Sequence, residues 1–194
     1  MTLQLTKKHN FDTVYDSQKV FRLILEVMSN PTRVVSISEY ADKLYGDHPV
    51  FLTVAMALLD NEVSFNTCEN CQLSDDVISL TLAKRETVDN ADFIFVCNPN
   101  DVNNVIEYAK CGTLADPHKS ATIIIRNDGE PTERLTLSGP GIDGQIEVTV
   151  TQTVKDAIAL RDAQNYEYPQ GIDLIFISDE GELFAIPRLV KVVR

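Results

Sequence analysis

The fold is decided by a stretch in the middle of the chain, Ala91-Asp92-Phe93-Ile94-Phe95-Val96-Cys97, an apolar run that indicates a buried central strand. Beyond it, Val102, Val105, Ile106 and Ala109 share one face of a helix, which we expect to end at Gly112. A second apolar run over residues 122–126 predicts the next buried strand. These elements form a β-α-β unit, whose crossover should be right-handed.

Helices and short strands are expected before this unit. Val20, Ile24 and Val27 recur at helical spacing, so a helix should run from Asp16 to Ser29 with Asp16 as its N-cap. Ser74 suits the start of another helix, although residues 77–82 also alternate like a strand. Further elements are expected at residues 33–37 (strand), 49–60 (helix) and 63–66 (strand).

Strands dominate the chain after the β-α-β unit. Alternating residues predict strands at 134–137 and 145–150, and residues 172–178 and 183–186 read as a hairpin. Thr153 and Asp156 resemble a capping box, so a helix should start there and run to about Tyr166. The sum is an α/β fold, a mixed β-sheet flanked by helices, and residues 1–194 are expected to form a single domain.

Composition excludes several classes of function. The net charge of -12 argues against a nucleic-acid partner, because that affinity depends on Lys and Arg neutralising phosphates. The longest apolar runs are far shorter than the ~20 residues that a membrane-spanning helix needs. Residues 1–10 contain no apolar segment typical of a secretory signal. We therefore expect a cytoplasmic protein that binds neither nucleic acid nor membrane.

Cys68 and Cys71 form a C-x-x-C pair, which can ligate zinc or cycle as a dithiol. A zinc site needs about four ligands, and Cys97 and Cys111 are poorly spaced as a second pair. The redox interpretation needs the first thiol at a helix N-terminus, whereas the helix is expected to begin after both cysteines. Free structural thiols are favoured over both alternatives.

Gly139-Pro140-Gly141-Ile142-Asp143-Gly144 matches the dinucleotide-binding pattern G-x-G-x-x-G. That motif works where its last glycines open a helix, whose N–H groups bind pyrophosphate. Residues 145–150 instead have a strand pattern. A rigid loop between two strands is favoured over a nucleotide site.

No other pattern announces catalysis. His9, His48 and His118 stand in separate loop contexts without a metal-ligand spacing, and no nucleophile elbow G-x-S-x-G is present. We therefore assign no catalytic, cofactor-binding or metal-binding residue.

Several segments together resemble the PhnH subunit family of carbon–phosphorus lyase, in order and in spacing. They are residues 21–31 (FRLILEVMSNP), 135–142 (LTLSGPGI), 168–176 (YPQGIDLIF) and 185–188 (AIPR). One position departs from the family pattern: Thr32 stands where the family commonly has glycine, which puts the geometry of that turn in doubt.

The resemblance implies a fold similar to a reduced type I pyridoxal-phosphate transferase, without its cofactor site and without a cofactor. It implies a homodimer that joins subunits G, I and J in a core complex. With the I subunit as catalyst, that complex forms ribose 1-alkylphosphonate 5-triphosphate from ATP and an alkylphosphonate, displacing adenine. The chain would be a non-catalytic, structural subunit of this transferase in phosphonate catabolism.

The alternative is a stand-alone, transferase-like enzyme with a cryptic ligand site. Gly139, Gly141 and Arg188 are the candidate ligand or interface residues, because glycines permit close backbone approach and Arg pairs with anions.

Overall fold

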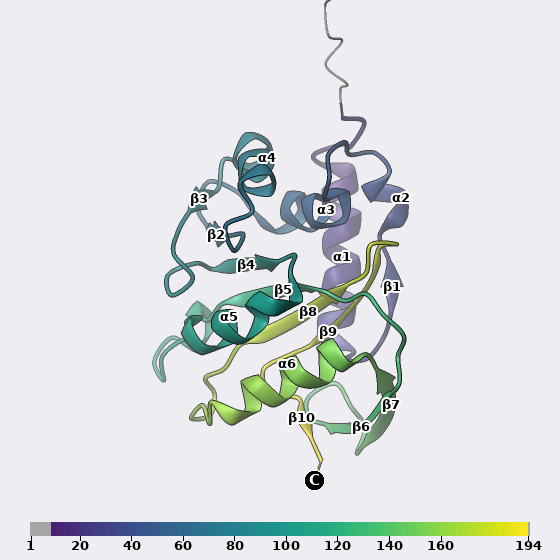
Figure 1. Ribbon diagram of the computed structural model, residues 1–194, viewed down its shortest axis with the longest axis vertical. Coiled ribbons are helices and arrows are strands. Elements are labelled where there is room, and N and C mark those ends of the chain that lie inside the picture. Colours follow the sequence, from purple (N-terminus) through teal and green to yellow (C-terminus); the bar gives the residue numbers. More distant parts are fainter. Residues whose placement is uncertain (1–8, 194) are drawn as a thin grey trace, which may run out of the picture.

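The computed structural model describes residues 9–193, and Figure 1 shows a sheet covered by helices on both faces. The expectation about a secretory signal in residues 1–10 falls mostly outside this range. Among the described residues, no helix combines the length and the apolar character that crossing a membrane requires. The single domain over residues 1–194 stays a prediction.

The large sheet has seven strands in the order β1-β9-β8-β5-β4-β2-β3. Neighbours from β8 to β3 pair in parallel, whereas β9 runs antiparallel to β8 and β1. The mixed sheet with flanking helices is therefore confirmed; the likeness to a pyridoxal-phosphate transferase stays a prediction. Its strands are β1 (Val35–Ser36), β2 (Ser64–Asn66), β3 (Lys84–Arg85), β4 (Phe93–Val96), β5 (Thr122–Arg126), β8 (Asp173–Ile177) and β9 (Glu182–Ile186).

The predicted β-α-β unit is confirmed as β4, α5 (Val102–Tyr108) and β5, with Ile94 opposite Ile123 in the parallel register. A 3-10 turn over Pro99–Asp101 precedes the helix. The predicted helix end at Gly112 is wrong, because the helix already ends at Tyr108. Gly112 does adopt a φ of +79°, but it serves a turn in which an added Cβ would lie 2.7 Å from the carbonyl oxygen of Pro117.

Both faces of the central strands are buried. Ile94 and Val96 pack in one core with helices α5 and α6 (Gln152–Ala163), and Phe95 packs in the other with α1, α3 and α4. This two-sided burial explains why strand β4 reads as an apolar run rather than an alternating one. The helices of the second core are α1 (Tyr15–Ser29), α2 (Ser38–Ala41), α3 (Pro49–Leu58) and α4 (Cys71–Thr81).

A second sheet was not foreseen. Strand β6 (Glu133–Ser138) pairs antiparallel with β7 (Ile146–Val150) on one side and β10 (Lys191–Val192) on the other. The strands expected at 134–137 and 145–150 exist, but they pair with each other. In Figure 1 this small sheet lies beside the C-terminal end of the chain.

The helix predicted from about Asp16 to Ser29 is confirmed as α1, but its predicted N-cap, Asp16, is wrong, as are the predicted helix starts at Ser74 and Thr153. Helix α1 starts earlier, because Asp12 accepts hydrogen bonds from the backbone N–H groups of the next residues, Val14 and Tyr15. Helix α6 starts at Gln152, since Thr151 accepts from Val154 N, and it ends at Ala163 rather than near Tyr166. Helix α4 starts at Cys71, so the strand alternative over residues 77–82 is wrong as well.

Candidate functional site

The glycine loop between β6 and β7 packs against the end of helix α1. Gly141 has a φ of +84°, and an added Cβ would lie 2.5 Å from the carbonyl oxygen of Ser29 and 2.6 Å from Cδ of Pro31. Thr32, the residue that departs from the family pattern, has a φ of +77°. Thr32 is thus a β-branched residue in the left-handed conformation, which favours glycine. Segments 21–31 and 135–142 therefore meet in space.

The same loop packs against the segment that follows β9. At Gly139, where φ is +141°, an added Cβ would lie 2.7 Å from the carbonyl oxygen of Leu189 and 2.9 Å from Cα of Val190. Strand β7 follows the loop, so the G-x-G-x-x-G pattern opens no helix, and the predicted loop between two strands is confirmed. Both glycines serve close backbone contact; that they touch a ligand or partner stays a prediction.

Arg188 is engaged within the chain. Its Nε lies 3.1 Å from Oδ2 of Asp173, its Nη2 forms an ion pair with the same carboxylate, and its Nη1 donates to the carbonyl oxygen of Pro117. Its backbone N–H also donates to Asp173 Oδ1, at 2.8 Å. Gly171 lies beneath this pair, where an added Cβ would be 2.9 Å from Cβ of Arg188. Segments 168–176 and 185–188 are joined here.

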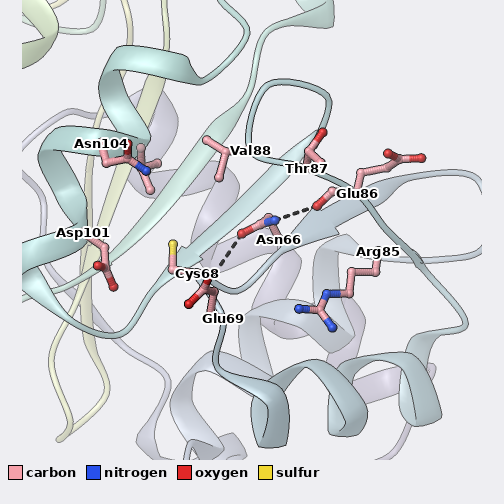
Figure 2. Close-up of a pocket in the computed structure, with 10 residues that line it drawn as sticks. Asn66, Cys68, Glu69, Arg85, Glu86, Thr87, Val88, Asp101 and Asn104 are labelled. Carbon is pink, nitrogen blue, oxygen red and sulfur yellow. Dashed lines mark hydrogen bonds between the residues drawn. The ribbon is translucent and has the colours of Figure 1, made fainter.

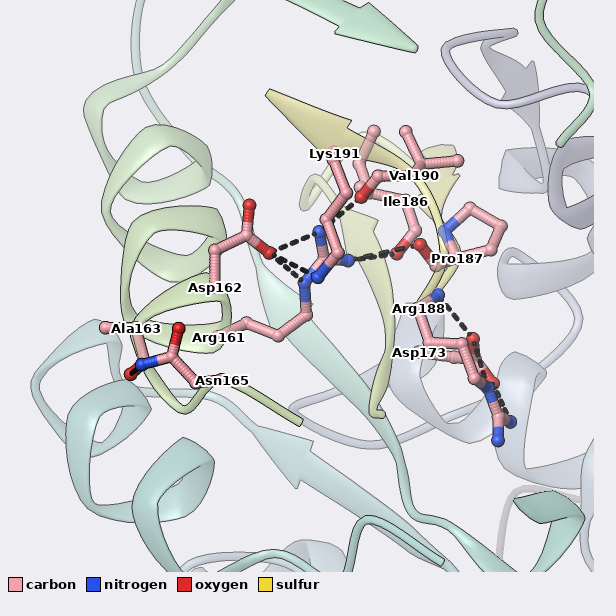
Figure 3. A network of polar contacts seen from close by, with 10 residues as sticks. All are labelled: Arg161, Asp162, Ala163, Asn165, Asp173, Ile186, Pro187, Arg188, Val190 and Lys191. Atoms are coloured by element: carbon pink, nitrogen blue, oxygen red, sulfur yellow. Dashed lines mark hydrogen bonds and ion pairs between the residues drawn. The ribbon is translucent and has the colours of Figure 1, made fainter. Parts of the chain in front are cut away.

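A buried arginine that sequence analysis missed organises the neighbouring turn (Figure 3). Arg161 on α6 is 0% exposed and donates to the carbonyl oxygens of Ile186, Pro187 and Val190, at 3.1, 3.2 and 2.6 Å. Its Nη2 also lies 3.0 Å from Oδ1 of Asp162. Burial lowers the pKa of the guanidinium, yet Arg stays charged in proteins. Arg161 thereby fixes the corner between β9 and β10.

The local sequence gives one weak signal for Arg161: it sits in the last turn of α6, where a cation is ordinary. Which carbonyl oxygens it would meet depends on the corner after β9, some 25 residues further along the chain. The helix pattern alone therefore cannot distinguish it from an exposed arginine.

A pocket of about 370 Å³ opens beside this network. Arg188 and Lys191 line it together with two tyrosines, Tyr166 and Tyr168, and no carboxylate side chain belongs to its lining. Lys191 is half exposed, and its Nζ lies 3.0 Å from Asp162 Oδ1. The network holds three cations against two carboxylates, an unusual balance in a chain of net charge -12. The pocket therefore suits an acceptor-rich or anionic group better than a cation.

The C-x-x-C pair is split by the start of helix α4. Cys71 is the first residue of that helix and is exposed, and Asn70 caps the helix by accepting from Leu73 N. Cys68 is partly buried instead, and burial raises the pKa of its thiol to about 12. Burial likewise raises the pKa of Cys97 to about 11. A redox dithiol requires a lowered pKa at the first cysteine, so Cys68 does not fit that interpretation.

Two of the three histidines, His9 and His48, have partners elsewhere in the chain. His9 accepts from the backbone N–H of Tyr45 through Nδ1, at 3.0 Å, and Nε2 of His48 lies 2.8 Å from Nδ2 of Asn70. His118 sits in a 3-10 turn over Pro117–Lys119. Within residues 9–193, no three His, Cys, Asp or Glu side chains are grouped so that they could hold a metal ion.

The fold and the site together define an α/β protein with a largely parallel sheet, in which four separated segments of sequence converge on one C-terminal corner. These are the segments that carry the family resemblance. A sequence model of the family described as bacterial phosphonate metabolism protein (PhnH) matches residues 9–193. The chain belongs to the PhnH family.

One relative has a printed description that is more specific. It is named as a putative C-P lyase subunit protein, HtxG, from Stutzerimonas stutzeri. It is 28% identical over 178 residues, which cover 90% of this chain and 85% of the relative.

Proposed function

We propose that the chain is a subunit of a carbon–phosphorus lyase core complex. The observation that carries the proposal is the family match over nearly the whole described chain, together with the relative named as a C-P lyase subunit. In that complex it would support formation of ribose 1-alkylphosphonate 5-triphosphate from ATP and an alkylphosphonate, with adenine displaced. The setting would be the cytoplasm.

The proposed role is assembly rather than catalysis. Arg188, the charged residue among the candidates, is bound to Asp173, and the half-buried thiols have raised pKa values. The partners would be a second copy of the chain and subunits G, I and J. The likeness of the fold to a reduced pyridoxal-phosphate transferase is part of this proposal and is implied by the family resemblance.

Co-expression with subunits G, I and J, followed by measurement of the mass of the purified assembly, tests this function. A chain that elutes alone in the presence of all three partners contradicts it. A matched pair of variants sharpens the test: Leu25 lies in the family segment 21–31 and is 53% exposed, whereas Leu114 lies outside the family segments and is 55% exposed. Leu25→Gln should weaken assembly more than Leu114→Gln if the family segments dock partners.

One observation favours a second function, a ligand-binding, transferase-like enzyme: the pocket beside Arg188 has a basic lining. ATP, pyridoxal phosphate and alkylphosphonates can each be tested by thermal shift, because a ligand at ~100 Kd adds about 2.7 kcal/mol of stability. Lys191→Met should abolish any shift that arises in this pocket. Lys84→Met removes an exposed lysine elsewhere and serves as the control. If none of these compounds raises the melting temperature, the second function is contradicted.

A further inference from the structure

A second, larger cavity lies apart from the C-terminal corner, at the carboxyl ends of β2 and β4. It measures about 700 Å³, within the range of ligand sites. The chain leaves β2 through α4 toward β3, and leaves β4 through α5 in the opposite direction along the sheet. The two helices pack in opposite cores. This arrangement makes the gap between β2 and β4 a topological switch point, where open α/β sheets bind ligands.

The floor of the cavity is fixed by hydrogen bonds. Asn66, at the end of β2, donates through Nδ2 to the carbonyl oxygen of Glu86 and accepts through Oδ1 from the backbone N–H of Cys68, at 2.6 and 2.8 Å (Figure 2). Cys68 and Glu69 both have positive φ, at +50° and +66°. Consecutive non-glycine residues with positive φ are uncommon, and they persist where the surrounding structure holds the backbone in that conformation.

Five polar side chains that line the cavity lack an internal partner. Within residues 9–193, the side chains of Glu69, Arg85, Glu86, Asp101 and Asn104 form no hydrogen bond or ion pair. In the view of Figure 2, Asp101 and Asn104 lie on one side of the Cys68 thiol and Asn66 on the other. These free groups offer carboxylate acceptors, one guanidinium and one amide.

The charge of the lining selects against anions. Glu69, Glu86 and Asp101 place three carboxylates around the cavity, against one cation, Arg85. A triphosphate would meet repulsion from these groups. Val88 adds apolar surface, which a metal ion or a simple polyamine would leave unused.

We propose that this cavity binds a nucleoside whose base carries an exocyclic amine, such as adenosine. The amine donates to a carboxylate, and the amide of Asn104 can pair with the amine and an adjacent ring nitrogen together, as Asn does with adenine. A second carboxylate of the lining accepts from a ribose hydroxyl, as the acidic residue of dinucleotide-binding folds does. The base contacts the surface of Val88. The inference rests on the cavity and not on the proposed function.

Titration calorimetry of the purified chain with adenosine, inosine and ATP tests it. Adenosine should bind at least about tenfold more tightly than inosine, whose carbonyl replaces the amine and would face the carboxylates. ATP should bind more weakly than adenosine, and added salt should narrow that difference because it screens the repulsion. Spermidine, a polyamine without a base, is the control: its binding would measure attraction to the carboxylates by charge alone.

Neighbouring asparagines on α5 provide the matched variants. Asn104→Leu should weaken adenosine binding about tenfold, whereas Asn103→Leu, exposed on the same helix but outside the lining, should leave it unchanged. Asp101→Asn should narrow the difference in affinity between ATP and adenosine, because it removes one carboxylate that repels the triphosphate. Equal binding of adenosine and inosine, tighter binding of ATP than of adenosine, or binding of spermidine without adenosine would overturn the proposal. Co-purification with the complex is measured separately and does not depend on this result.

Discussion

Replacing Arg161 by methionine should destabilise the folded chain by about 3–5 kcal/mol, the range found when one partner of a buried ionic network is removed. Methionine fills much of the volume of the arginine stem but donates no hydrogen bond. The carbonyl oxygens of Ile186 and Val190 accept from the guanidinium in buried bonds, and that of Pro187 accepts in a partly buried one.

The magnitude follows from these three acceptors. A buried polar group left without a partner costs about 1–3 kcal/mol. Two fully buried carbonyl oxygens therefore account for roughly 2–6 kcal/mol, while water can reach the oxygen of Pro187. The variant no longer bears the cost of burying the guanidinium charge, and this offsets part of the loss of stability. Asp162 also keeps its ion pair with Lys191. For a domain of this size, the melting temperature should fall by roughly 6–20 °C.

Urea denaturation followed by circular dichroism measures the effect. Arg134→Met is the matched control, because Arg134 is exposed on β6 and should change stability by no more than about 0.5 kcal/mol. A loss below about 1 kcal/mol for Arg161→Met, or a loss equal to that of the control, would refute the view that Arg161 holds the corner after β9.

Further predictions concern strain, thiols and pH. Gly141→Ala should cost at least about 2 kcal/mol more than Gly144→Ala, because an added Cβ meets Ser29 and Pro31 at Gly141 and nothing within 4 Å at Gly144; equal melting temperatures would contradict this. Thr32→Gly should raise stability by about 1 kcal/mol in urea denaturation by relieving its positive φ, and a loss would show that the turn is unstrained. Iodoacetamide at pH 8 should modify Cys71 first and leave Cys68 and Cys97, whose pKa values burial raises to about 12 and about 11, largely intact in mass spectra. Burial tends to raise the pKa of Asp16, but hydrogen bonds from Lys43 and the Asp12 backbone outweigh it and lower that pKa below 3.8. The stability contributed by Asp16 is therefore complete above that value and lost as pH falls through the lower folded pKa, so Asp16→Asn should flatten the fall in urea midpoint between about pH 5 and 2.

The sequence predicts the central layer well, because its signals are local. The apolar runs of β4 and β5 are long enough to indicate burial on both faces, and one helical face lies between them. The hairpin of β8 and β9 is likewise confirmed. Burial of whole strands leaves a pattern that needs no knowledge of the partner strand.

Helix starts and strand partners were harder to predict. Asp12 and Asp16 are both acidic residues that suit a cap, and the backbone geometry decides between them. Thr151 and Thr153 pose the same choice at α6. The small sheet depends on β10, which joins β6 across more than fifty residues, and an alternating pattern does not say which strand it will pair with.

The candidate residues Gly139, Gly141 and Arg188 lie close together, and their role as ligand or interface residues stays a prediction. They converge on one corner through backbone contact and an internal ion pair. Arg161 and the cavity at the ends of β2 and β4 were missed. Both arise from elements distant in sequence, and neither has a local motif.

The pairing of β5 with β8, a strand much later in the sequence, has a consequence for folding during synthesis on the ribosome. Strand β5 pairs with β4 on one side and β8 on the other, yet β8 follows β5 only after about 45 further residues have been added. At about 5–20 residues per second, the edge of β5 stays open for roughly 2–9 s. During that interval Ile123, Ile124 and Ile125 present an unpaired, strongly apolar edge on which another nascent strand can add. Once β8 has been synthesised, it pairs with β5 and covers this edge. Slow translation between β5 and β8 should therefore lower the yield of native protein.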